Sequence, residues 1–149
     1  ASARNSHHLH GNRTQARAPM TLAALLLIAL LFGGMVLYSF GFAAFLFNTL
    51  PAETAGPTIR KAFPHFYLFV IATSGFAGFL LLPSDAVAGV IALTIAVTTV
   101  PTRQLLMPAI NAATDASEKR RFALLHGGSV VITLIHIVAA GYILSRFLT

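Results

Sequence analysis

The stretch from Thr21 to Leu50 contains no charged residue, and it restricts the fold of this chain more than any other feature. A bilayer has a hydrocarbon core about 30 Å thick, which about 20 helical residues can cross. The stretch is therefore long enough to span a membrane with tilt, and too long for the apolar segment of a signal peptide. We expect a transmembrane helix over residues 21–49.

Composition extends this expectation to most of the chain. Hydrophobic residues make up 56% of the sequence and charged residues only 9%, against roughly 25% charged in a soluble domain. Further apolar stretches predict helices at about 65–82, 86–110 and 122–146. Short connections favour antiparallel neighbours, so we predict an all-α integral membrane bundle of four antiparallel transmembrane helices in residues 20–149. Residues 1–19 are polar and are expected to form a flexible tail.

Proline and glycine set the expected boundaries between these helices. Residues 51–63 hold several of them and are predicted to form a loop. Pro83 is expected to end the second helix, and the very short turn after it predicts an antiparallel hairpin in which Asp85 can cap the third helix. Pro101 and Pro108 are each expected to kink or break that third helix.

The net charge of +6 comes from basic residues that flank apolar runs. This distribution favours topology signals and contacts with the lipid bilayer over a nucleic-acid surface. Six basic residues belong to one side of the predicted bundle: Arg60, Lys61, Arg103, Lys119, Arg120 and Arg121. The positive-inside rule then places this side in the cytoplasm and both termini on the periplasmic side of a bacterial inner membrane. The three arginines of the tail weaken that asymmetry.

The first predicted helix carries small and polar residues on one face. Gly34, Tyr38 and Gly41 follow one another at steps of four and three, which keep them in register on a helix. Small residues let helices approach closely inside a membrane bundle. We therefore expect this face to pack against another helix.

The last predicted helix carries a polar stripe. His126, Ser129, Thr133 and His136 are spaced by three, four and three residues. Lipid offers no hydrogen bonds, so the stripe is expected to face the bundle interior. The two histidines lie about 15 Å apart along the helix at 1.5 Å per residue, too far to share one metal ion.

His65 and His126 form the candidate cofactor site. Each follows a connection on the same side of the membrane, so the two imidazoles are expected at a similar depth on two helices. That arrangement can ligate a haem b iron or a copper ion. The alternative is structural, in which His65 anchors the helix at the interface and His126 bonds a neighbouring helix.

Catalytic patterns are not visible in the sequence. The four acids, Glu53, Asp85, Asp115 and Glu118, all fall in predicted connections, away from any base inside the membrane. We predict a non-catalytic accessory subunit or structural component that packs with other membrane-protein subunits. A haem- or copper-binding protein is the alternative, and a small-solute transporter is the second alternative.

Three short segments carry a family resemblance: residues 34–41, residues 60–64 and residues 125–127. With these, the chain resembles the uncharacterised transmembrane-protein-205-like family, a bacterial domain of unknown function. The resemblance implies a four-helix membrane protein. It also implies that His126 is a feature shared with the family. More distantly the layout is similar to CopD-type copper-resistance proteins and HemJ-type haem-pathway oxidases, although their full histidine and acid pattern is not found here.

Overall fold

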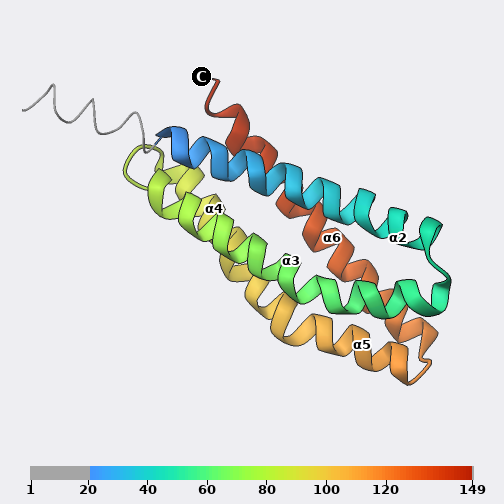
Figure 1. The fold of residues 1–149 in the computed structure, drawn as a ribbon. Helices are drawn as coiled ribbons and strands as arrows, with labels where there is room; N and C mark the ends of the chain where they lie inside the picture. Colours follow the sequence, from blue (N-terminus) through green and yellow to red (C-terminus); the bar gives the residue numbers. More distant parts are fainter. Residues whose placement is uncertain (1–20, 149) are drawn as a thin grey trace, which may run out of the picture.

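The computed structural model describes residues 21–148, and within this range the chain forms four helices that are long and apolar enough to cross a membrane (Figure 1). The four spans are Thr21–Thr49, Ala52–Leu81, Ala86–Asp115 and Lys119–Ser145. The predicted fold class, an all-α bundle of four membrane-spanning helices, is confirmed. The tail predicted at residues 1–19 lies outside the described residues.

Successive helices run antiparallel, so the connections at residues 50–51 and 116–118 lie at the same end of the bundle (Figure 1). The first span ends in a π-helix and a short α-helix, and the third span contains a π-helical segment between two α-helices. The labelled elements are η1 (Leu37–Phe42), α2 (Ala43–Thr49), α3 (Ala52–Leu81), α4 (Ala86–Pro101), η2 (Thr102–Leu106), α5 (Met107–Asp115) and α6 (Lys119–Ser145).

Helix α3 begins at Ala52, so the prediction of a loop over residues 51–63 is wrong. Pro51 occupies the N-cap position, where its missing N–H costs nothing. The 30 residues of α3 extend about 45 Å, more than the roughly 30 Å hydrocarbon core. Its first turns therefore project into the interface, where water can bond the carbonyls that Pro57 and Pro64 leave unpaired. Arg60 also pairs with Asp115 of α5 at 2.8 Å, which holds this extension against the bundle.

Pro101 and Pro108 were each expected to kink or break the third helix. Neither ends it, because the third span continues as helix through both prolines. Between Pro101 and Pro108 the chain forms η2, in which the N–H of Met107 donates to the carbonyl of Thr102, five residues earlier. A local π-helical turn of this kind satisfies backbone groups that proline would otherwise leave without partners. The span therefore reaches Asp115 instead of ending near residue 110.

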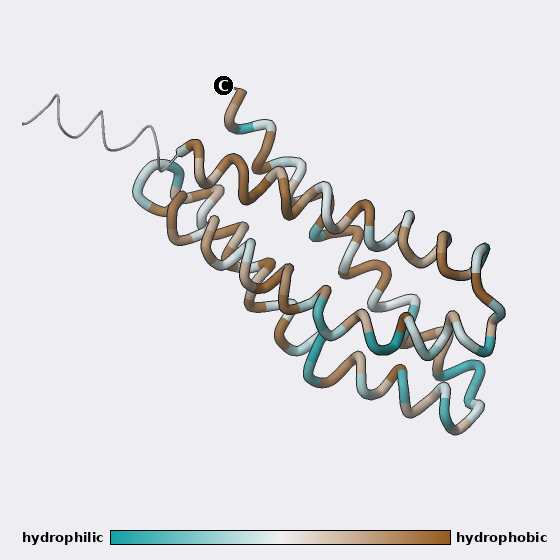
Figure 2. Tube along the Cα trace, viewed as in Figure 1, coloured by the Kyte–Doolittle hydropathy of each residue, from teal (hydrophilic) through white to brown (hydrophobic). Residues whose placement is uncertain are grey.

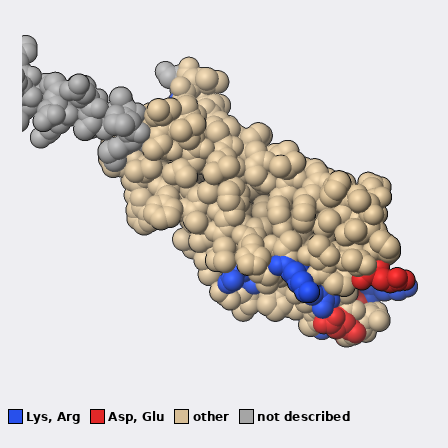
Figure 3. Space-filling view, in the orientation of Figure 1, with Lys and Arg blue, Asp and Glu red and all other residues tan. Residues whose placement is uncertain are grey.

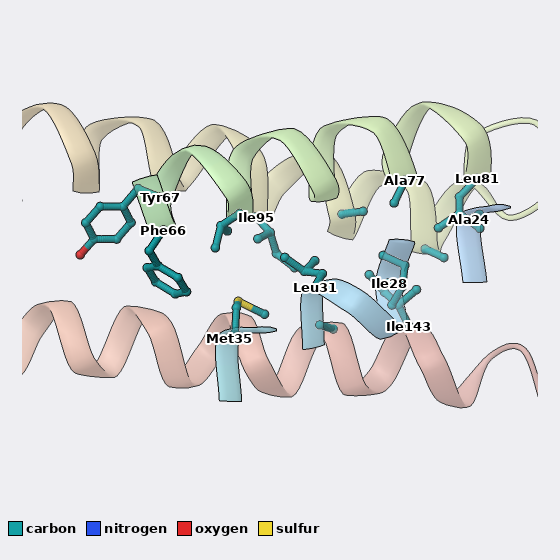
Figure 4. Close-up of a cluster of buried hydrophobic side chains, with 14 residues drawn as sticks. Ala24, Ile28, Leu31, Met35, Phe66, Tyr67, Ala77, Leu81, Ile95 and Ile143 are labelled. Atoms are coloured by element: carbon teal, nitrogen blue, oxygen red, sulfur yellow. The ribbon is translucent and has the colours of Figure 1, made fainter. Parts of the chain in front are cut away.

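The core lies along the middle of the bundle, between α3, α4, α6 and the first span. Ile28 and Leu31 of the first span are fully buried between α3 and α6 (Figure 4). The helices are apolar through most of their length (Figure 2). Many of these apolar side chains lie on the outside: Phe76 and Val138, for example, are 68% and 72% exposed. An apolar exterior over an apolar core is what a surrounding bilayer requires.

Helices α3 and α4 approach closely because glycines face each other's backbones. A Cβ added at Gly78 would lie 3.1 Å from the carbonyl oxygen of Gly89, and one added at Gly89 would lie 2.8 Å from the amide nitrogen of Leu82. These contacts involve backbone atoms, which cannot swing aside as a side chain can. The tight hairpin after Pro83 therefore depends on Gly89.

We predict that Gly89→Ala destabilises the bundle by about 1–3 kcal/mol through overpacking. The matched control is Gly127→Ala on α6, where an added Cβ meets nothing within 4 Å and helix propensity favours alanine by about 1 kcal/mol. Thermal unfolding in a mild detergent, followed by circular dichroism, measures both. Equal melting temperatures for the two variants would contradict this account of the hairpin.

An ion pair closes the end of the bundle that holds this hairpin. Asp85 caps α4 by accepting from the N–H of Ala88 at 3.1 Å. Its carboxylate also accepts from Nη2 of Arg146 at 3.0 Å and from Nε of the same side chain. The forked Arg146 bond and the Ala88 bond lower the pKa of Asp85 below its ordinary value. The turn is thereby tied to the end of α6.

This lowered pKa predicts acid sensitivity. The folded Asp85 holds its proton less tightly than the unfolded one, so its contribution is complete above pH about 4 and is lost as the pH falls through the lower folded pKa. The melting temperature of the wild type should therefore drop more between pH 6 and pH 3 than that of Asp85→Asn. The control is Asp115→Asn, which changes the exposed pair with Arg60. Its melting temperature should fall between pH 6 and pH 3 by as much as that of the wild type.

Candidate functional site

The polar stripe of α6 lies partly inside the bundle and partly outside it. Ser129 and His136 are buried, at 7% and 9% exposure, and Ala140 on the same face is fully buried. Thr133 is half-buried, whereas His126 is exposed and stacks on Phe122 of its own helix with ring centroids 5.2 Å apart. The interior part of the stripe thus begins at Ser129.

Ser129 contacts α3 through a buried hydroxyl pair. The phenol oxygen of Tyr67 lies 3.1 Å from Oγ of Ser129, and Tyr67 is itself only 4% exposed. A hydroxyl in a membrane interior has no water to bond, so the two groups satisfy each other across the bundle. This bond fixes the rotation of α6 relative to α3.

His136 contacts α4 through Thr98, whose Oγ lies 2.9 Å from Nε2 of the imidazole. The hydroxyl of Thr98 also lies 2.6 Å from the carbonyl oxygen of Thr94. A threonine hydroxyl has one proton, and a carbonyl can only accept it. The proton of Thr98 is therefore given to Thr94, and Nε2 of His136 must carry the proton that it donates to Thr98. When the ring is neutral, this assignment leaves Nδ1 as its unprotonated nitrogen.

A small cavity of about 10 Å³ lies next to these groups. Its polar lining comes from Tyr67, Thr99, Thr102, Thr133 and His136. The three threonine hydroxyls donate to carbonyls of their own helices, at 2.7, 3.0 and 3.0 Å, so any further bond that they make is as acceptors. The volume and the acceptors suit one water molecule, and the cavity is far too small for a haem.

Two π-helical segments flank this cavity. Thr102, which lines it, is the first residue of η2, and Met35, which also lines it, lies just before η1. Tyr38 of η1 stacks on the cavity-lining Phe66, with ring centroids 4.6 Å apart and planes 11° from parallel. Such segments are rare and occur often at functional sites. We define the polar core as the polar residues that line this cavity together with two hydrogen-bond partners, the buried Ser129 and the exposed Thr98. Its members are Tyr67, Thr98, Thr99, Thr102, Ser129, Thr133 and His136.

The small residues of the first span differ in their surroundings. A Cβ added at Gly34 would lie 2.7 Å from the ring of Phe69 on α3, so this glycine lets the first span approach α3. A Cβ added at Gly41 would meet only Leu37 of its own helix, at 3.1 Å. Gly34 thus makes an interhelical contact, as does Tyr38, whereas Gly41 sits against its own preceding turn.

His65 and His126, the predicted cofactor ligands, are both on the outside of the bundle. His65 precedes the buried Phe66 of α3 but is itself exposed. No hydrogen bond or ring contact joins the two imidazoles within residues 21–148, and in the same range no three His or acidic side chains group closely enough to hold a metal ion.

Fold and polar core together define a small polytopic membrane protein with a hydrogen-bonded interior. The chain belongs to the family described as Domain of unknown function (DUF4149), whose model matches residues 26–119. The match runs from the first span to the first residue of α6. Neither the curated proteins nor the solved structures contain a significant match to the chain.

Sequence reasoning missed the α3 and α4 side of the polar core. Tyr67, Val70, Ser74 and Ala77 are buried at steps of three, four and three residues, so helical periodicity could have found this face. The partners Thr98 and Thr99 gave no comparable signal, because threonine is common in lipid-facing positions where its hydroxyl bonds its own helix.

A double-mutant cycle tests the bond between α3 and α6. Tyr67→Phe and Ser129→Ala should couple by about 0.6–1.7 kcal/mol, the range for hydrogen bonds between transmembrane helices. Unfolding free energies in mixed micelles give the coupling. Thr94→Val removes an exposed hydroxyl that bonds only its own helix and should be additive with Tyr67→Phe. A coupling near zero for the first pair would show that the bond does not form.

Proposed function

We propose that this protein is a non-catalytic accessory subunit or structural component of a membrane complex, and that it packs against its partner through the outer face of α6. The observation that supports this is the peripheral position of α6. In the most apolar 18-residue stretch of α6, only 6% of the residues are buried within the chain. The corresponding shares are 44% for α3 and 39% for the third span. This helix is attached to the bundle along one narrow side.

The composition of that outer face favours a protein partner over lipid. Gly127 and Gly128 are exposed, and a Cβ added to either meets nothing within 4 Å. Their neighbour His126 exposes an imidazole that lipid tails cannot bond. Small residues and exposed hydrogen-bonding groups are the features that drive association of transmembrane helices.

The charge distribution supports an orientation within this proposal. In residues 21–148 six of the seven Lys and Arg side chains lie in the half of the bundle that holds the connections at residues 50–51 and 116–118. The Lys and Arg atoms visible in Figure 3 gather in this half. The seventh, Arg146, lies at the other end. We infer that the basic end faces the cytoplasm of a bacterial cell and that the opposite end faces the periplasm.

The alternative functions stay as predictions. For haem or copper binding, the outward positions of His65 and His126 would require a partner to complete the coordination sphere. The distant resemblance of the layout to the CopD-type and HemJ-type families motivates this alternative. An absorption spectrum and metal analysis of protein purified without metal-affinity resin separates it from the accessory role. Solute transport is the third candidate, and uptake by reconstituted vesicles tests it.

The accessory role predicts a complex that one substitution disrupts. Native membranes solubilised in mild detergent and resolved by native electrophoresis should show the wild-type chain with the same partner subunit in every preparation. Gly128→Leu should reduce the amount of complex at least about tenfold, since a bulky side chain prevents close helix approach.

Gly33→Leu is the matched control, because Gly33 is also exposed with open space around it but lies on the first span. It should leave the complex intact. A wild-type chain that migrates as a monomer, or only with copies of itself, would contradict the accessory role. Equal loss in both variants would contradict the assignment of the interface to α6.

A further inference from the structure

The basic end of the bundle contains a shallow hollow on α6 with mixed character. Its lining consists of Glu118, Lys119, Arg120, Arg121, Leu124 and Leu125. The three cations lie within the first turn of α6, and the leucines lie one turn further along, in the apolar part of the span. The hollow therefore crosses the level at which charged residues give way to hydrocarbon, which is where phospholipid phosphates lie.

The hollow has more cationic than anionic side chains. Arg121 pairs with Glu118 at 3.0 Å. Lys119 and Arg120 make no ion pair within residues 21–148, and both side chains are exposed. In contrast, Arg60 pairs with Asp115 and Arg146 pairs with Asp85. Within residues 21–148, Lys119 and Arg120 therefore leave the hollow with a net positive charge.

The apolar wall of the hollow determines which anion fits. Leu124 is 70% exposed and lies beside the cations on the same surface. A free anion would use only the charged part, whereas a phospholipid uses both parts, with its phosphate on the cations and its acyl chain along the leucines. We propose that this hollow binds the headgroup of an anionic phospholipid, through Lys119 and Arg120, with an acyl chain against Leu124.

This site goes beyond the proposed accessory role and does not depend on it. The lipid contacts lie in the first two turns of α6, before the glycines proposed to meet a partner. A test on the purified single chain in detergent requires no partner subunit, so failure of the lipid site and failure of the accessory role are distinguishable.

Native mass spectrometry of the purified chain, titrated with phosphatidylglycerol or phosphatidylcholine, tests the proposal. Phosphatidylglycerol should bind at least tenfold more tightly. Each basic residue near an anionic surface contributes about 1 kcal/mol, so Arg120→Gln should weaken binding about fivefold and Lys119→Gln with Arg120→Gln about 25-fold. Lys61→Gln, which removes one exposed charge from α3 at the same end, should leave the affinity unchanged. Circular dichroism verifies that each variant is folded.

A second arm separates a lipid from a free phosphate. Leu124→Asn should weaken phosphatidylglycerol binding, and millimolar inorganic phosphate should not displace the lipid. The proposal is overturned if the two lipids bind equally, if Lys61→Gln weakens binding as much as Arg120→Gln, or if inorganic phosphate competes and Leu124→Asn has no effect.

Discussion

The structure depends on one constraint: inside a bilayer, every polar group must find its partner within the protein. The backbone meets it by forming helices over almost all of residues 21–148. The side chains meet it by two kinds of bond. Most threonines donate to the carbonyl one turn earlier, as Thr99 does to Ile95 at 2.7 Å, and a few groups bond between helices, as Tyr67 does to Ser129 and His136 to Thr98. No fully buried side-chain nitrogen or oxygen in the described residues lacks a partner.

The same constraint explains how the bundle tolerates residues that usually break helices. The π-helical turn η2 lies between Pro101 and Pro108 and changes the backbone hydrogen-bond pattern there. Pro57 and Pro64 lie in the first half of α3, whose start extends beyond the hydrocarbon core, so water can bond the carbonyls that they leave without donors. Glycine contributes by allowing close packing. Gly89 has no side chain, so α4 can lie against the backbone at the end of α3. Packing and hydrogen bonding therefore determine the interior. The charges lie toward the ends of the spans except that of Arg103, whose Nε donates to the carbonyl oxygen of Pro64 at 3.4 Å within the third span.

The four spans could be predicted from the sequence, because a long run without charged residues has few possible structures other than a transmembrane helix. The positions of the basic residues in the sequence also predicted that most of them lie on one side of the bundle. Periodicity also singled out the stripe that contains Ser129 and His136. It could not reveal where the bundle stops covering that stripe, and so His126 was assigned to the interior although the structure leaves it exposed. The start of α3 was missed because proline near an interface resembles proline in a loop. The bonds from Tyr67 and Thr98 depend on helix rotation, which one sequence does not encode locally.

The central claim is that the four spans are antiparallel and that all but one described basic residue lie in one half of the bundle. Its most direct test is the accessibility of single cysteines in sealed membrane vesicles. The chain has no cysteine, so Lys61→Cys, Arg120→Cys and Ser84→Cys each introduce a unique thiol. A membrane-impermeant maleimide should label positions 61 and 120 from one side and position 84 only from the other. Labelling of all three from the same side, or of 61 and 120 from opposite sides, would contradict the fold described above.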